Sequence, residues 1–125
     1  MHKNPDAALF SASNPFAKIL TGEIPCNTVY ENDKVLVFED VAPKAPVHLL
    51  IIPKVMGLVN LQSMPSDHLD VLIDIAKAAK EVATQLNLRG YRLVTNSGYF
   101  GGQRVPHLHF HLLSGDQAPL CENII

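Results

Sequence analysis

"RVPHLHFHLL", residues 104–113, places His107, His109 and His111 at alternate positions, with a leucine or a phenylalanine between them. On a β-strand, successive side chains point to opposite faces, so the three imidazoles share one face and the apolar residues share the other. The apolar face can pack on a core, which leaves the histidines on an open surface. The stretch therefore predicts a strand with a histidine-lined face.

The residues alone leave three explanations for this face open. A surface strand that happens to be rich in imidazole needs no function. A zinc site could use the H-x-H spacing with His48, Asp40 or Cys26, although no H-E-x-x-H motif or paired cysteines support it. A nucleophilic catalyst would need one imidazole fixed in one tautomer, and nearby charge-stabilising donors. Gly101 and Gly102 would let backbone N–H groups approach an oxyanion.

Composition limits the class of protein. A chain of 125 residues fits one domain, and 47% hydrophobic residues leave material for a subunit interface. The net charge of −2, without a run of Lys or Arg, argues against a nucleic acid polymer as partner. No stretch of about 18 apolar residues predicts a membrane span. Two distant cysteines suggest no disulfide framework, and we expect a cytoplasmic protein.

The first half of the chain predicts a short helix and three strands. We expect residues 1–13 to form a flexible arm and residues 14–125 a single domain. Asn14 caps the helix, Pro15 begins it and Gly22 ends it. "TVYENDKVLVFED", residues 28–40, is typical of a hairpin, and "VHLLIIP", residues 47–53, of a third strand.

The second half predicts a long helix and two more strands. Residues 66–88 carry apolar side chains at 69, 72, 73, 76, 79, 83 and 86, the spacing of an amphipathic helix. Its start is marked by Pro65, Ser66 and Asp67, and its end by Gly90. Strands over 91–96 and 107–113 follow. The fold class is α+β, an antiparallel sheet of about five strands with one long and one short helix.

The histidine strand also resembles a known family. "HLHFHLL" matches H-φ-H-φ-H-φ-φ, where φ is hydrophobic, which is the signature of the histidine-triad (HIT) superfamily of nucleotide hydrolases and transferases. "NPFAKILTGEIPCNTVYENDKVLVFEDVAPKAPVHLLIIPK" and "GYRLVTNSGYFGGQ" extend the resemblance over residues 14–113. They are similar to the nucleotide-binding branch that includes purine nucleoside phosphoramidases. The resemblance implies a homodimer with one continuous sheet across the interface.

It also implies roles for four histidines. His109 matches the nucleophile that forms a covalent nucleotidyl-histidine before water releases the nucleotide. His107 matches the residue whose backbone carbonyl orients that nucleophile. His111 matches the third triad member, which works in a network with His48. No metal and no cofactor is implied, and the expected ligand is a purine nucleotide, AMP or GMP.

Other positions match the groups that bind the nucleotide in this family. Asp40 matches the carboxylate that holds the ribose hydroxyls. Three residues match groups at the α-phosphate or its bridging atom, and four fall where the family builds its apolar base pocket. The phosphate set is Asn96, Gly102 and Gln103, and the pocket set is Phe16, Ile19, Phe38 and Val41.

Arg104 is a departure from the family pattern, because close relatives often carry Ser or Thr after the glutamine. A guanidinium does not readily release a proton to a leaving group at neutral pH, but it can clamp a phosphate. The tail "SGDQAPLCENII" also differs from the better-known tails of the branch. Besides a phosphoramidase, the sequence is compatible with a dinucleoside polyphosphate hydrolase or with a nucleotide-binding regulatory protein of little turnover.

Overall fold

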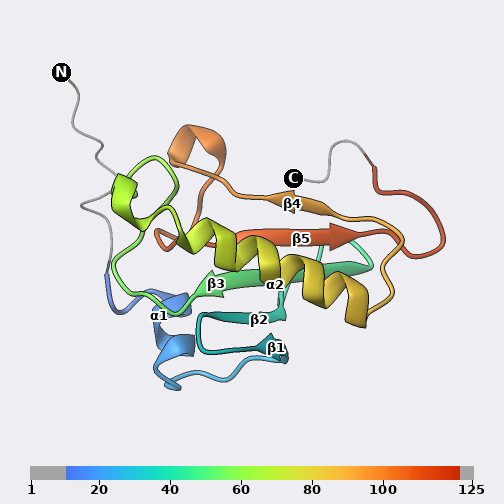
Figure 1. Cartoon of the computed structure of the whole chain (residues 1–125), viewed down its shortest axis with the longest axis horizontal. Coiled ribbons are helices and arrows are strands. Elements are labelled where there is room, and N and C mark those ends of the chain that lie inside the picture. The colour runs from blue at the N-terminus through green and yellow to red at the C-terminus, as the bar shows by residue number, and fades with distance from the viewer. Residues whose placement is uncertain (1–10, 122–125) are drawn as a thin grey trace.

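The computed structural model describes residues 11–121. Five strands form one antiparallel sheet in the order β1-β2-β3-β5-β4. This confirms the predicted α+β sheet with one long and one short helix (Figure 1). The ends of the predicted arm and domain, residues 1–10 and 122–125, lie outside the described residues. The elements are α1 (Pro15–Leu20), β1 (Thr28–Glu31), β2 (Val35–Glu39), β3 (Val47–Pro53), η2 (Ser66–His68), α2 (Val71–Gln85), β4 (Arg92–Val94), η3 (Tyr99–Gly101) and β5 (Phe110–Ser114).

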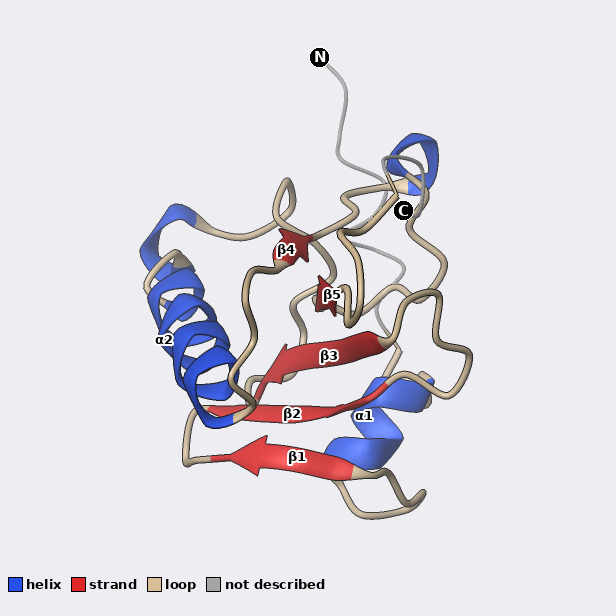
Figure 2. Ribbon diagram, turned by 90° about the vertical axis from the view of Figure 1, so that its right-hand side faces the viewer, coloured by secondary structure: helices blue, strands red, loops and turns tan. Residues whose placement is uncertain are grey.

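The two α-helices lie on opposite faces of the sheet (Figure 2). Under α2, the main core joins alternate residues of the central strands, including Val37, Ile51 and Leu112. A smaller cluster under α1 joins residues of the other face, including Phe38 and Ile52. Each buried side chain of this size contributes about 1.5–3 kcal/mol. Both faces of the sheet are thus partly covered, and the uncovered part of the α1 face is available for polar groups.

The buried side of α2 differs from the prediction. Five residues face the sheet: Val71, Ile75, Ala78, Ala79 and Val82. Of the seven predicted apolar positions, Ala79 belongs to this set and the partly buried Leu72 packs against the same core, while Leu69, Ile73 and Leu86 are exposed. The helix carries two apolar stripes, and the one with two alanines allows a closer approach to the sheet.

The ends of α2 also differ from the prediction. Residues 66–68 form a 3₁₀ turn, and the α-helix begins only after Asp70. The positive φ of 53° that follows the helix belongs to Asn87, three residues before the predicted stop at Gly90. Asparagine tolerates this left-handed conformation better than other non-glycine residues. No described helix is long and apolar enough to cross a membrane.

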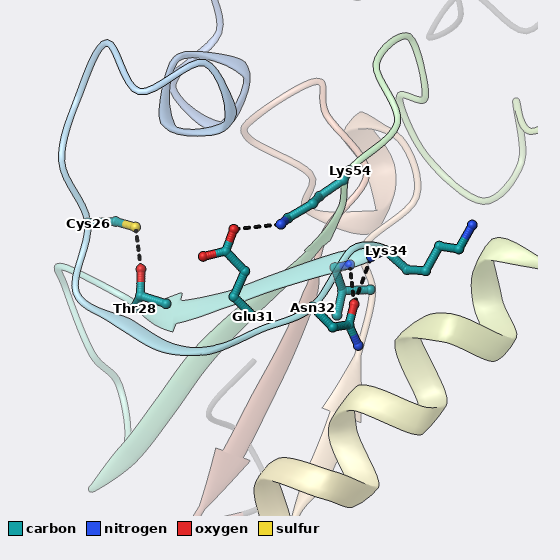
Figure 3. A network of polar contacts seen from close by, with 7 residues as sticks. Cys26, Thr28, Glu31, Asn32, Lys34 and Lys54 are labelled. Atoms are coloured by element: carbon teal, nitrogen blue, oxygen red, sulfur yellow. Dashed lines mark hydrogen bonds and ion pairs between the residues drawn. The ribbon is translucent and has the colours of Figure 1, made fainter.

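Side-chain contacts fix the turn end of the hairpin formed by β1 and β2. The Asn32 Oδ1 atom accepts hydrogen bonds from the backbone N–H groups of Lys34 and Val35, which closes the turn. Figure 3 shows this turn beside an ion pair that joins Glu31 on β1 to Lys54 beyond β3. The predicted turn at Asn32-Asp33 is therefore confirmed.

Candidate functional site

The nucleophile predicted at position 109 is held by a short hydrogen bond. The His109 Nδ1 atom lies 2.6 Å from the backbone oxygen of His107. A carbonyl only accepts, so the imidazole carries its proton on Nδ1 and keeps a lone pair on Nε2. Thr95 Oγ1 also donates to the His109 carbonyl, at 2.8 Å. Regular pairing of β5 begins only at Phe110 and not at the predicted residue 107, so the first two triad histidines lie in the segment before the strand.

The first triad histidine is held by Asn14, which is predicted only as a helix cap. The ring of His107 is fully buried, and its Nδ1 atom lies 3.1 Å from Nδ2 of Asn14. Asn14 also caps α1, as predicted, through Oδ1 and the backbone N–H of Ala17. Asn14 and His107 are 93 residues apart, and no local sequence signal links them.

His48 and His111 form a hydrogen-bonded pair, and the backbone of Lys44 determines which of the two rings donates. The backbone N–H of Lys44 donates to His48 Nδ1 at 3.0 Å, so the proton of His48 is on Nε2. His48 Nε2 lies 2.9 Å from His111 Nδ1, which therefore accepts. The proton of a neutral His111 is thus on its own Nε2. The two neighbouring triad members therefore differ at Nε2, which carries no proton in His109 and carries the proton in His111.

Asp40, which the family resemblance assigns to the ribose hydroxyls, lies beside this pair. Its Oδ2 atom lies 3.4 Å from His48 Nε2, and its Oδ1 atom accepts from the backbone N–H of Ala42. One nitrogen or oxygen from each of Asp40, His48 and His111 lies within 4.8 Å of the others, close enough to hold a metal ion. Such an ion would need the lone pair of His48 Nε2, and the Lys44 N–H places the proton there. The donor set therefore fits a hydrogen-bond network better than a metal.

Cys26, the third sequence candidate for a zinc ligand, is not part of this cluster. Its thiol contacts Thr28 Oγ1 at 3.5 Å on the β1 side of α1, as Figure 3 shows. The structure thus separates the one nearby thiol from the histidines. A thiolate-supported zinc site is not assembled among residues 11–121.

The carboxamide of Gln103 is fully used inside the loop before the triad. Its Oε1 atom accepts from the backbone N–H of Gly98 and from Asn60 Nδ2, at 2.9 and 3.0 Å. Its Nε2 atom donates to the carbonyls of Val59 and Val105, at 2.7 and 2.9 Å. Gln103 therefore anchors the loop in this structure, and the partner Asn60 is a residue that the sequence analysis missed.

The backbone N–H groups of Gly101 and Gly102 are not directed at an anion, contrary to the expectation. They donate to the carbonyls of Gly98 and Tyr99, at 3.0 Å each, within the 3₁₀ turn. Gly102 has a φ of 88°, which favours glycine, and Asn96 Nδ2 closes the turn by donating to Gly101 O at 2.7 Å. The loop is thus internally bonded, and the Nε2–H of His111 is a candidate donor to an oxyanion.

The predicted base-pocket residues are only partly brought together. The ring of Phe16 packs edge-on against Phe38 and against His109, with centroids 5.8 and 4.8 Å apart. Val41 is fully exposed on the loop after β2. Ile19 packs on the same cluster as Phe16 but also lines a hollow of about 380 Å³, with Cys26, Glu31 and Lys54 among its other lining residues.

Burial lowers the pKa of every histidine in the network. Removal from water, aided by the positive charge of a neighbouring His109, brings the pKa of His107 to about 4. Burial and the charges of His109 and His48 bring the pKa of His111 to about 4. Burial also lowers the pKa values of His109 and His48, although the hydrogen bond to His107 O and the Asp40 carboxylate, respectively, oppose it. All four rings are therefore neutral near pH 7.

Arg104 lies exposed at the end of the loop, two residues after Gly102. None of the ion pairs among the described residues involves its guanidinium. A side chain in this state is available to an anionic ligand.

Comparison with known proteins supports the assignment. A family model described as "HIT domain" matches residues 21–118. A "14 kDa zinc-binding protein" of Brassica juncea is 48% identical, with 82% of this chain and 92% of the relative covered. "Adenylylsulfatase HINT1" of Arabidopsis thaliana is 47% identical, with 82% and 71% covered. The solved structure of a "HIT family hydrolase" from Clostridium thermocellum is 41% identical, with a TM-score of 0.81 and 90% and 98% covered. The matched family model and these relatives show that the chain belongs to the HIT superfamily, in the branch of HINT-like nucleotide-binding hydrolases.

Proposed function

We propose that this protein hydrolyses purine nucleoside 5′-phosphoramidates, in which AMP or GMP is linked to an amine. The observation that carries the proposal is the 2.6 Å hydrogen bond from His109 Nδ1 to the His107 carbonyl. This bond places the proton of the ring on Nδ1, and burial lowers the pKa of His109, so the neutral imidazole has its free lone pair on Nε2, which is what attack on phosphorus requires. Asp40 is the candidate for holding the ribose, and Phe16 and Phe38 for the floor under the base.

The reaction proceeds in two steps on His109. In the first, His109 Nε2 forms a bond to the α-phosphorus and the phosphorus–nitrogen bond breaks, so that the amine leaves with the bonding electrons and takes up a proton from the solvent. In the second, water attacks the α-phosphorus and returns a proton to the solvent, the bond to His109 breaks with its electrons returning to Nε2, and the nucleotide leaves. The Nε2–H of His111 is the donor offered to the charge that builds on the phosphate oxygens.

Turnover of matched substrates tests the proposal. Release of AMP is measured with an AMP-amine phosphoramidate, adenylylsulfate and a dinucleoside polyphosphate, for the wild type and for His109→Ala. We expect the wild type to prefer the phosphoramidate and the variant to lose turnover of all three. Full activity in His109→Ala would contradict the mechanism. Micromolar AMP binding by a wild type without turnover would favour a regulatory nucleotide-binding protein.

Arg104 favours a second candidate, hydrolysis of nucleotides whose leaving group is an anion such as sulfate or a polyphosphate. The exposed guanidinium has no ion-pair partner among the described residues, and it can bind an anion through two parallel hydrogen bonds. Arg104→Ser separates the candidates. If the leaving group is anionic, the variant loses about tenfold to a hundredfold in kcat/KM, the size of a charged hydrogen bond. If it is an amine, the variant is as active as the wild type or more active.

Zinc is not part of the proposed mechanism, although two relatives, from Brassica juncea and Zea mays, are named for binding it. Bound at Asp40, His48 and His111, the ion would supply a Lewis acid near the phosphate. That arrangement would require His48 to move its proton to Nδ1, against the Lys44 N–H. We therefore expect a chelator to leave turnover unchanged.

We also propose that the protein is a homodimer formed through β4. This strand is an edge of the sheet. Leu93 in the strand and Tyr91 directly before it have exposed side chains. Ile73 on α2 is also exposed. An unpaired edge with apolar neighbours favours pairing with a second copy.

A further inference from the structure

The cap of α1 is bonded to the catalytic segment. Asn14 is only 7% exposed, and its carboxamide makes three hydrogen bonds. Oδ1 accepts from Ala17 N at 2.9 Å, and Nδ2 donates to Ser11 O at 2.8 Å. The remaining N–H of Nδ2 points to His107 Nδ1 at 3.1 Å. A capping residue needs only the first of these bonds.

The direction of the Asn14–His107 bond is fixed by the other two. A backbone N–H only donates and a backbone carbonyl only accepts, so Ala17 and Ser11 determine which end of the carboxamide is oxygen. The Nδ2 atom is therefore a donor, and His107 Nδ1 must accept. This bond holds His107 as a neutral ring with its proton on Nε2.

The same helix contacts the nucleophile. Phe16, two residues after the cap, lies edge-on to the rings of His109 and His107, with centroids 4.8 and 5.9 Å away. The carbonyl of His107 in turn holds His109 Nδ1. The cap, the first histidine and the nucleophile thus form one connected chain of contacts.

We propose that Asn14 is a positioning residue of the active site, which acts through His107 to hold the carbonyl that orients His109. Asn14 touches neither the substrate nor the reacting atoms. The proposal rests on the proposed function, because it assumes that His109 is the nucleophile. Its first consequence, the tautomer of His107, does not depend on any activity.

Two substitutions separate this role from capping. Asn14→Asp keeps an oxygen for the Ala17 N–H and places a negative charge at a helix N-terminus, where it is favourable. It presents an oxygen to His107 Nδ1, which would have to be protonated. Asn14→Ser keeps a capping oxygen on a shorter side chain, so the link to His107 is lost. Lys18→Gly is the control, because it weakens α1 by about 1 kcal/mol without touching Asn14 or His107.

The first readout is the protonation of the His107 ring in the free protein, from two-bond ¹H–¹⁵N spectra at pH 7. We expect a bare Nδ1 in the wild type and in Lys18→Gly, and a protonated Nδ1 in Asn14→Asp. The second readout is kinetic. We expect kcat to fall about tenfold to a hundredfold in Asn14→Asp and Asn14→Ser, with KM little changed, as for a nucleophile displaced by a fraction of an ångström.

The outcomes distinguish the two proposals. A His107 ring in Asn14→Asp that matches the wild type, or a normal kcat in both Asn14 variants, would overturn the positioning role. A fall in kcat for Lys18→Gly equal to that of the Asn14 variants would reduce Asn14 to a helix cap. If the wild type turns over no nucleotide while the ring of Asn14→Asp is protonated at Nδ1, the proposed function fails and the coupling of Asn14 to His107 is supported.

Discussion

His48 Nε2 donates to His111 Nδ1 across 2.9 Å. His48 is the donor because the backbone N–H of Lys44 donates to its other ring nitrogen, Nδ1. The result is a protonated Nε2 on His111 beside the bare Nε2 of His109, with ring centroids 5.1 Å apart. The network therefore offers a nucleophile and a hydrogen-bond donor from neighbouring neutral rings.

Replacing His48 with phenylalanine removes the hydrogen bond to His111 and keeps an aromatic ring in the buried site. We expect His48→Phe to lower kcat about a hundredfold, because His111 is no longer held with its donor toward the phosphate. His68→Phe is the matched control, since His68 is exposed on the 3₁₀ turn η2 and its ring nitrogen Nδ1 pairs with Asp67, away from the triad in the sequence. Steady-state kinetics of both variants check this. Equal effects would refute a role for the His48–His111 bond.

Replacing Gln103 with glutamate tests the loop anchor. The carboxylate would keep the bonds from Gly98 and Asn60 but face the carbonyls of Val59 and Val105 without a hydrogen to donate. Two lost bonds in a half-buried site predict a loss of about 2–4 kcal/mol in the free energy of unfolding. Urea denaturation of Gln103→Glu measures this loss. The exposed Gln62→Glu variant is expected to lose less than about 0.5 kcal/mol.

The buried histidines predict a loss of stability in acid. His107 and His111 have pKa values of about 4 in the folded protein, against about 6.5 in an unfolded chain. Between these values the unfolded chain binds more protons, so the free energy of unfolding is fully retained above pH 6.5 and falls as the pH drops toward 4. His107→Gln is expected to flatten this fall. Urea denaturation between pH 7.5 and 4.5 measures the free energy of unfolding at each pH. The same pH dependence in His107→Gln as in the wild type would contradict the prediction.

The edge strand β4 predicts a sensitive interface. Leu93→Lys places a charge on this edge, which disfavours strand pairing between copies. We expect light scattering after size exclusion to give a dimer mass for the wild type and a monomer mass for the variant. Leu61→Lys, at an exposed leucine outside the strands and α2, is expected to remain dimeric. A monomeric wild type would refute the interface.

Local features of the fold could be predicted from the sequence, and choices between similar packings could not. The cap at Asn14 and the turn at Asn32 depend on neighbouring residues, and both are present in the structure. The prediction that the histidines lie on an open surface is wrong for His107 and His109, which are buried because Phe16 of α1 packs against their rings. The face of α2 was predicted wrongly because two apolar stripes run along the same helix, and only packing against the sheet selects between them.

The candidate site shows the same division. The family pattern identified His109 and His48, whereas the directions of their hydrogen bonds depend on Lys44 and on the main chain, which carry no residue-type signal. The bond between Asn14 and His107 spans 93 positions and arises only when α1 docks on the sheet. The directions in which the N–H groups of Gly101 and Gly102 point depend on the loop conformation. The sequence does not determine that conformation, because glycine can adopt many backbone conformations.

The central claim is that the bare Nε2 of His109 becomes bonded to the nucleotide. It is tested most directly by mixing the enzyme with an AMP-amine phosphoramidate, quenching within milliseconds in alkali to spare the acid-labile phosphorus–nitrogen bond, and locating the adduct by peptide mass spectrometry. The account predicts one adenylyl group on His109 in the wild type and none in His109→Gly. Rapid AMP release by the wild type with no adduct, or an adduct on His107 or His111, would contradict it.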